Sequence, residues 1–190
     1  MKVEQKKIYL ADTSGFVLAD CAVFDESDRA ILKEIYNEWR ALSEKLKKIG
    51  SRYLNIPDGL SESAVCLTLG FVKVLKTKQT KGSQSFDVYD LDRRKRVQIK
   101  ACSVIPDLTS FGPRTQWDDI YFVDFFRQGK WDGSFDIYLI PNELISNQNV
   151  NKGKGQTVRD KQKAQQRPRF SIYDSIIRKF GIPPTCTGRL

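Results

Sequence analysis

Three side chains with complementary chemistry, Asp87, Gln98 and Lys100, lie close together within residues 85–103. They belong to two runs of alternating apolar and polar residues, which the basic turn 92–95 separates. This pattern predicts a β-hairpin, and antiparallel pairing would place the three side chains together on one face. An acid, an amide and an amine on one sheet surface suit a site that binds a divalent cation beside a phosphate. The alternative is a surface hairpin with ordinary solvated side chains.

A further acid, Glu62, lies upstream in a segment that reads as a helix over residues 61–76, with Ser61 as its N-cap. The residues three, four and seven positions after Glu62 are apolar: Val65, Cys66 and Leu69. Glu62 therefore falls on the inward-facing stripe of this helix. A buried ionised carboxylate is costly unless it is paired or binds a metal, so Glu62 is a candidate partner for Asp87. The alternative is an acid of the first helical turn that stays in solvent.

The order of these residues, Glu62, then Asp87, then Gln98-Ile99-Lys100, resembles the nuclease core called PD-(D/E)XK. In that core an essential acid opens the second strand, an acid-x-lysine triplet lies on the third, and a helical glutamate often completes the site. Gln98 stands where an acid is usual, which leaves one fewer negative charge around the metal. Related nucleases with a Q-x-K triplet exist, so this difference does not defeat the match.

The resemblance implies a role for each of these residues. Asp87 would bind Mg²⁺ with its carboxylate, helped by the Ile99 carbonyl and, directly or through water, by Glu62. Lys100 would orient or deprotonate the attacking water and balance charge in the transition state. Gln98 would hold a water or a metal ligand in place of the usual acid.

A longer resemblance covers roughly residues 50–175 and narrows the class of nuclease. Six segments are similar to parts of small Type II restriction endonucleases of the group that recognises GCNGC: NIPDGLSES, SFDVYD, VQIKA, DLTSFGP, KWDGSFDIYLIPN and RPRFSI. This similarity implies Mg²⁺-dependent, site-specific hydrolysis of double-stranded DNA. A palindromic target implies a two-fold homodimer, because each site cuts one strand. It also implies a cognate DNA methyltransferase in the host, which is not expected to be a stable subunit.

The composition favours a nucleic-acid partner. The 190 residues carry a net charge of +9 at pH 7 and a pI near 9.4, a balance that suits a polyanion. No apolar stretch reaches the length of a membrane span, and no signal peptide is visible at the N-terminus. The four cysteines lie far apart, at Cys21, Cys66, Cys102 and Cys186. Their spacing argues against a zinc cluster and fits reduced thiols in the cytoplasm.

The chain contains no histidine. This excludes hydrolases that need a histidine base, nucleophile or ligand, including those with a Ser-His-Asp triad. Phosphodiester cleavage by this chain would have to rest on carboxylates, lysine and a metal, which is the chemistry that residues 85–103 suggest.

The elements that position these residues read as an α/β fold in a single domain, residues 1–190. A helix is predicted over residues 26–49, and its inward-facing apolar residues are expected to be Ile31, Ile35, Trp39, Leu42, Leu46 and Ile49. Aromatic-rich strands are expected at 119–126 and 134–141. The expected architecture is a mixed central sheet of four to five strands flanked by the helices at 26–49 and 61–76.

The two ends of the chain carry weaker signals. Residues 1–25 read as an irregular or short-strand lead. Ser171 is expected to cap a final amphipathic helix that ends at Gly181. The closing residues 183–190 are expected to be irregular.

Two polar segments are candidates for DNA contact. In the loop at 105–118 the candidates are Arg114 and Gln116, and an ordinary surface loop is the alternative. Residues 147–169 are basic and almost free of apolar side chains, so they form either a disordered linker or a segment that folds over DNA. The candidates in this segment are Arg159, Arg167 and Arg169.

Two other functions fit part of the same pattern. A repair or junction nuclease would share the core and the metal site but lack the sequence preference. A non-catalytic nucleic-acid-binding protein would keep the basic surface alone. Incubation with plasmid DNA and Mg²⁺ separates the three, because they would give discrete bands, a smear or structure-dependent nicks, and intact DNA.

Overall fold

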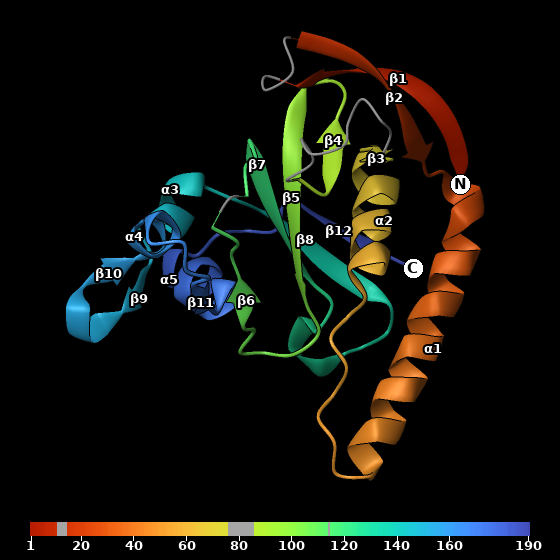
Figure 1. Cartoon of the computed structure of the whole chain (residues 1–190). Helices are drawn as coiled ribbons and strands as arrows, with labels where there is room; N and C mark the ends of the chain where they lie inside the picture. The colour runs from red at the N-terminus through yellow and green to blue at the C-terminus, as the bar shows by residue number, and fades with distance from the viewer. Residues whose placement is uncertain (11–14, 76–85, 114) are drawn as a thin grey trace.

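A five-stranded mixed sheet forms the centre of the computed structural model, which describes residues 1–10, 15–75, 86–113 and 115–190. In the order β12-β8-β7-β5-β4, its strands are Cys186–Arg189, Ser134–Ile140, Asp119–Asp124, Lys95–Cys102 and Val88–Asp90 (Figure 1). β5 and β7 are parallel, and the other neighbours are antiparallel. The prediction of an α/β fold with a mixed sheet of four to five strands is confirmed.

Two helices, α1 (Arg29–Lys48) and α2 (Asp58–Leu69), share one hydrophobic core with this sheet, and the short helix η2 (Glu26–Asp28) leads into α1. α1 contributes Leu32, Tyr36 and Trp39, and α2 contributes Leu60, Ala64, Val65 and Cys66. The sheet contributes residues such as Val88, Val97, Ile99, Tyr121 and Val123. Among the described residues, no helix is long and apolar enough to cross a membrane.

The inward face of α1 differs from the prediction. Ile31, Ile35, Leu42 and Ile49 are 50%, 38%, 52% and 78% exposed. The buried side is formed instead by Leu32, Tyr36, Trp39 and Ser43. Of the predicted row, Trp39 is buried and Leu46 is partly buried. The helix carries two neighbouring apolar rows, and periodicity alone does not decide between them; the core takes the row with the two aromatic rings, which bury the larger apolar area.

The helix predicted at 61–76 is α2, but it begins and ends earlier. It starts at Asp58 behind an extended Pro57, and Gly70, in the left-handed conformation (φ 73°), ends it. Ser61 is therefore not the N-cap, and its hydroxyl donates to the carbonyl oxygen of Asp58 at 3.0 Å. Asp58 favours this earlier start, because an acid in the first turn complements the helix dipole.

The N-terminal region is more regular than predicted. β1 (Lys2–Leu10) and β2 (Gly15–Val23) form an antiparallel hairpin, and β2 also pairs with β3 (Lys73–Val74). This small sheet arches over the β4 end of the molecule (Figure 1). Its own core includes Ile8, Leu10, Cys21, Val74, Phe86 and Tyr89.

The opposite face of the central sheet is covered by short elements from the second half of the chain. They are β6 (Thr109–Ser110), α3 (Asn142–Ser146), β9 (Asn149–Asn151), η4 (Lys152–Lys154), β10 (Gln156–Thr157), α4 (Val158–Lys163), β11 (Arg169–Phe170), the π-helix η5 (Tyr173–Ile177) and α5 (Arg178–Phe180). Their shared core includes Phe111, Ile120, Phe122, Val158, Ile172 and Ile176. The alternative of a disordered linker at 147–169 is wrong, because this segment forms regular elements and Val158 is 1% exposed.

The expectation for the last residues, 183–190, is wrong as well. Within them, β12 pairs with β8 as the outer strand of the central sheet. The sequence carries no clear alternation because Gly188 lies against the ring of Phe135, where a Cβ would overlap that ring. By contrast, the final helix is confirmed: Ile172, Ile176 and Ile177 are buried, and Gly181 ends it in the left-handed conformation.

The buried carboxylate of Asp107 joins the loop after β5 to this final helix. One of its oxygens accepts from the Thr109 hydroxyl at 2.7 Å and from the Ile172 backbone N–H at 3.0 Å. The other accepts from the Ser171 hydroxyl at 2.5 Å and from the Tyr173 backbone N–H at 3.1 Å. Asp107 therefore binds the first N–H groups of a helix 65 and 66 residues later in the chain, while the predicted cap, Ser171, accepts from the Asp174 backbone N–H at 3.1 Å.

We expect Asp107→Ala to lower the free energy of unfolding by about 2–4 kcal/mol, since it leaves buried donors without acceptors and removes a helix cap. Urea unfolding followed by circular dichroism measures this change. The matched control is Asp92→Ala, at an exposed position on the β4–β5 turn. Equal unfolding midpoints for the two variants would contradict the capping role.

Candidate active site

The β4–β5 hairpin brings Asp87 against the triplet that the sequence singled out. The backbone N–H of Asp87 donates to the Val97 carbonyl at 3.0 Å, so Asp87 lies where the pairing of β4 with β5 begins. One oxygen of its carboxylate accepts from the backbone N–H of Ile99 at 2.7 Å and from the side-chain amide of Gln98. The predicted hairpin and the predicted proximity of Asp87 to Gln98 are confirmed.

The shortness of β4 explains this arrangement. β4 pairs with residues 95–97 of β5, so the following part of that β5 edge is not covered by β4. The Asp87 carboxylate satisfies the N–H of Ile99 there, in place of a strand partner. Because the N–H and C=O of one strand residue point to the same side, the Ile99 carbonyl faces this edge as well.

A cavity of about 320 Å³ lies at this edge, between α2, β5 and the loop that follows β5. The charged or amide side chains that line it are Asn55, Asp58, Glu62, Asp87, Gln98, Lys100 and Asp107. The four residues predicted as catalytic, Glu62, Asp87, Gln98 and Lys100, all belong to this lining.

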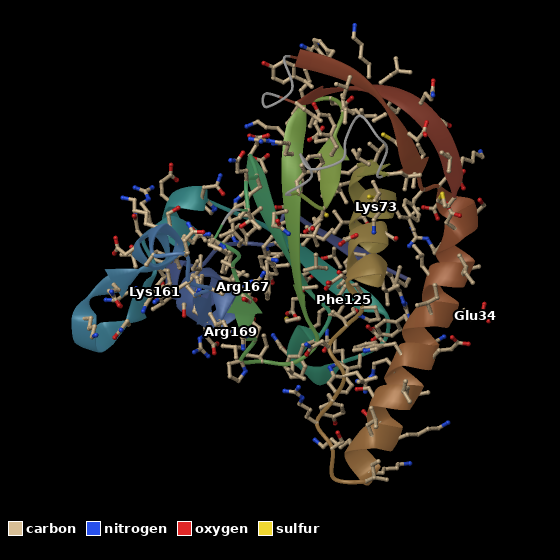
Figure 2. All side chains as sticks on the ribbon, in the orientation of Figure 1. Glu34, Lys73, Phe125, Lys161, Arg167 and Arg169 are labelled. Atoms are coloured by element: carbon tan, nitrogen blue, oxygen red, sulfur yellow. The ribbon has the colours of Figure 1, made fainter. Side chains whose placement is uncertain are left out.

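Glu62 reaches the cavity from α2, and its side chain is 13% exposed. Its carboxylate forms an ion pair with Lys73 of β3, which lies beside α2 (Figure 2). This pair meets the requirement that a largely buried carboxylate be compensated. Sequence reasoning missed Lys73, because it stands eleven residues from Glu62 on a different element. No local spacing signals such a contact.

Sequence reasoning also missed Asp58. It lines the cavity one helical turn before Glu62, on the same side of α2. The signal was present as an i, i+4 pair of acids, but a helix start placed at residue 62 hid it. The cavity lining therefore includes three carboxylates from α2 and the start of the β4–β5 hairpin, Asp58, Glu62 and Asp87, in addition to Asp107, which caps the final helix.

The charge balance of the cavity favours a cation. Burial raises the pKa of Asp87 from its ordinary 3.8 to about 6, and the negative charges of Glu62 and Asp58 act in the same direction. The hydrogen bond from the Ile99 N–H and the positive charge of Lys100 oppose this rise without cancelling it. A cation in the cavity would offset the free-energy cost of ionising Asp87, because it stabilises the charged carboxylate.

This pKa predicts a pH-dependent stability for the metal-free protein. Since the Asp87 pKa is raised on folding, its contribution is fully present below about pH 4 and is lost as the pH rises through about 6. Asp87→Asn mimics the protonated acid, so the variant should match wild type near pH 4. Near pH 7 it should be the more stable by on the order of 3 kcal/mol. Thermal unfolding in chelator from pH 4 to 7 tests this, and a constant difference between the proteins would contradict it.

The donors around the cavity are those of a hard divalent cation. Carboxylates, a backbone carbonyl and an amide suit Mg²⁺ or Ca²⁺. Within the described ranges, no three acidic or cysteine side chains converge closely enough to hold a metal by themselves. Mg²⁺ fits such a site, because it usually keeps several waters and takes only one or two protein carboxylates.

The candidate DNA-contacting residues occupy different places. Arg114 lies outside the described residues. Gln116 accepts from Arg96 at 3.5 Å, near the start of β5 and away from Lys100. The structure therefore does not bring Gln116 to the cavity.

Among the candidate arginines, Arg169 pairs with a residue of the cavity lining. β11 pairs with β6 in a register that places Arg169 opposite Ser110, and Ser110 lines the cavity. Figure 2 shows Arg167 and Arg169 close together beside β6. Arg159 belongs to α4, and no contact links it to the cavity within the described part of the chain. All three arginines are exposed.

A mixed sheet flanked by helices, with an acid-lined cavity and a lysine on a central strand, is consistent with a restriction-endonuclease-like fold. The chain belongs to the Bsp6I restriction endonuclease family, whose family model matches residues 24–179. It is 28% identical over 176 residues to the Type II restriction enzyme Bsp6I of Bacillus sp. (strain RFL6), a match that covers 92% of each chain. No solved structure matches the chain significantly.

The family assigns the enzyme class. The chain is a Type II restriction endonuclease, a site-specific deoxyribonuclease that acts on double-stranded DNA. This confirms the class that the sequence resemblance implied, against a repair nuclease or a non-catalytic DNA-binding protein. Enzymes of this class generally use a divalent metal ion.

Proposed function

We propose that this enzyme hydrolyses double-stranded DNA at a short GC-rich palindrome such as GCNGC, with Mg²⁺ as its cofactor. The convergence of Glu62, Asp87, Gln98 and Lys100 on one cavity carries this proposal. The recognition sequence rests on the similarity of six sequence segments to enzymes that recognise GCNGC.

Each residue of the cavity has a proposed part in the reaction. Asp87, the Ile99 carbonyl and Glu62 would hold the metal, which would supply Lewis-acid polarisation of the scissile phosphate and activation of water. Lys100 orients or deprotonates the attacking water and offsets the charge that develops on the phosphate. The amide of Gln98 holds Asp87 in place through its N–H, and its oxygen is left to accept from a bound water.

The target also implies partners and a setting. A palindrome is read by a two-fold homodimer of single-domain subunits, residues 1–190, in which each subunit cuts one strand. A cognate DNA methyltransferase would protect the host genome without being a stable subunit. We place the enzyme in the cytoplasm, where its four free cysteines stay reduced.

Digestion of a plasmid of known sequence tests the proposed target and metal. We expect discrete fragments with Mg²⁺ and intact DNA in chelator. When the sequenced fragment ends are mapped to the plasmid, every cut should fall at a GCNGC sequence. Fragments whose ends share a different sequence would overturn the proposed target. Cleavage in chelator would overturn the proposed metal.

The arginines of 147–169 should contribute to DNA binding. We expect at least one of Arg159→Ala, Arg167→Ala and Arg169→Ala to weaken cognate binding by about 1–3 kcal/mol with little effect on random DNA, as a base-reading arginine does. An arginine that contacts phosphate would instead weaken both and reduce the salt dependence. The measurement is binding to cognate and random duplexes in Ca²⁺ at two salt concentrations.

The control for these variants is Lys33→Ala, an exposed cation on α1. If all three arginine variants bind both duplexes as this control does, the segment takes no part in recognition.

A further inference from the structure

The exposed surface of α1 carries a row of apolar side chains that the fold leaves in solvent. Ile31, Ile35 and Leu42 of α1 and Ile49, the residue that ends it, follow one another at intervals of four, seven and seven residues. At about 100° per residue they lie within about 40° of one another around the helix axis. We call this set the α1 apolar row. Such heptad spacing of exposed apolar residues is typical of a helix that packs against another helix.

A row of charged residues runs beside the α1 apolar row. Glu34 and Glu38 lie in the first half of the helix, and Lys45 and Lys48 lie in the second half. All four are exposed, and none pairs with another side chain within the described residues. Figure 2 shows Glu34 pointing away from the sheet.

The order of these charges does not stabilise an isolated helix. Glu34 and Glu38 are one turn apart, as are Lys45 and Lys48, and like charges at this spacing repel. The helix dipole accounts for the lysines in the last turn. It does not account for the acids, because the first turn of α1 has none and the dipole acts within about one turn. The order of charges instead matches a second α1 that runs antiparallel to the first, because the acidic half of each helix would then face the basic half of the other.

We propose that the α1 apolar row binds the α1 of a second copy of this chain, antiparallel about a two-fold axis near Leu42. This inference rests on the proposed homodimer and names its interface. About that axis Leu42 meets Leu42 of the second copy, and Ile35 meets Ile49. Glu38 then faces Lys45, so the acidic half of one helix lies along the basic half of the other. The Ile35–Ile49 and Glu38–Lys45 contacts each occur twice and the Leu42–Leu42 contact lies once on the axis, as an isologous interface requires.

The place of α1 keeps the proposed interface apart from the cavity and the candidate arginines. α1 lies on the outside of the subunit, on the other side of the central sheet from Arg167 and Arg169 (Figure 2). α1 contributes no residue to the cavity lining. Pairing through α1 therefore leaves the arginines and the cavity free to contact a duplex.

Charge reversal gives a sharp test, because the two copies contribute opposite partners. In a Glu38→Lys homodimer two lysines face each other at both contacts, and in a Lys45→Glu homodimer two glutamates do. When the two variants are mixed, every contact is again a pair of opposite charges. We expect each single variant to dimerise at least about 10-fold more weakly than wild type and the mixture to recover wild-type affinity. Sedimentation velocity of the full chain in chelator measures both.

Two further variants complete the test. Leu42→Glu should weaken the dimer at least about 100-fold, because it places two charges at the centre of the apolar contact. Lys33→Glu is the matched control, since it reverses an exposed charge of α1 away from the row and should leave the dimer unchanged. Circular dichroism establishes that each variant is folded, and all four positions are exposed in the subunit.

A monomeric wild-type enzyme would overturn the inference, as would a Leu42→Glu protein that dimerises like wild type. The mixture failing to exceed the single variants would overturn the antiparallel register. Plasmid cleavage by wild type is scored separately. If wild type cuts at specific sites and Leu42→Glu does not weaken the dimer, the proposed function stands and the proposed interface is wrong. If Leu42→Glu weakens the dimer and wild type does not cut at specific sites, the proposed interface stands and the proposed function is wrong.

Discussion

Asp87→Asn should reduce DNA cleavage with Mg²⁺ at least about 10³-fold, because the carboxylate is the proposed anchor of the metal that activates water and polarises the phosphate. The fold should survive, since asparagine still accepts from the Ile99 N–H that now binds Asp87. DNA binding without metal should be retained or strengthened, because one negative charge beside the phosphate is removed. Single-turnover cleavage and fluorescence anisotropy measure the two effects.

Asp92→Asn is the matched control for this variant. It removes an acid from the exposed turn of the same hairpin and should cut like wild type. Near-normal cleavage by Asp87→Asn would show that the metal is held elsewhere.

Lys100→Met should reduce cleavage by about 10²–10³-fold, because it removes the positive charge that offsets the developing charge of the transition state. Methionine keeps the unbranched stem of the side chain, so packing along β5 should change little. Lys100→Arg separates the two proposed roles of the amine. An arginine retains the charge but does not transfer a proton, so recovered activity indicates electrostatic action and its absence indicates a base.

The control for the lysine is Lys95→Met, at the other end of β5 and away from the cavity. Its cleavage rate should match wild type. Loss of activity in this control would mean that the β5 variants act through the fold and not through the reaction.

The central hairpin was predictable because its signal is local. Alternation along β4 and β5 determines which side chains share a face, and the turn at 92–95 determines their pairing. The contact between Asp87 and Gln98 therefore forms as predicted. Glu62 was predictable for a similar reason, because the apolar spacing after it is helical in any context.

The remaining parts depend on contacts between distant segments. Lys73 compensates Glu62 across two elements, and Asp107 binds the first N–H groups of a helix 65 and 66 residues away. β12 forms against β8 although its own sequence carries no alternation. On α1 the choice between two apolar rows depends on what the rest of the chain places opposite them. Such choices are made by tertiary packing and leave no periodic trace in the sequence.

The ion pair between Glu62 and Lys73 means that the enzyme carries its own counterion. A newly synthesised subunit can therefore fold with this carboxylate already neutralised, before it meets any metal. With Glu62 as a ligand of the proposed metal, loading of the site would be an exchange in which an ammonium group and a divalent cation compete for one carboxylate. This competition would lower the occupancy of the site at low metal concentrations, so that synthesis of the nuclease would precede its activation. For a protein whose activity endangers the genome of its own cell, that interval is an advantage.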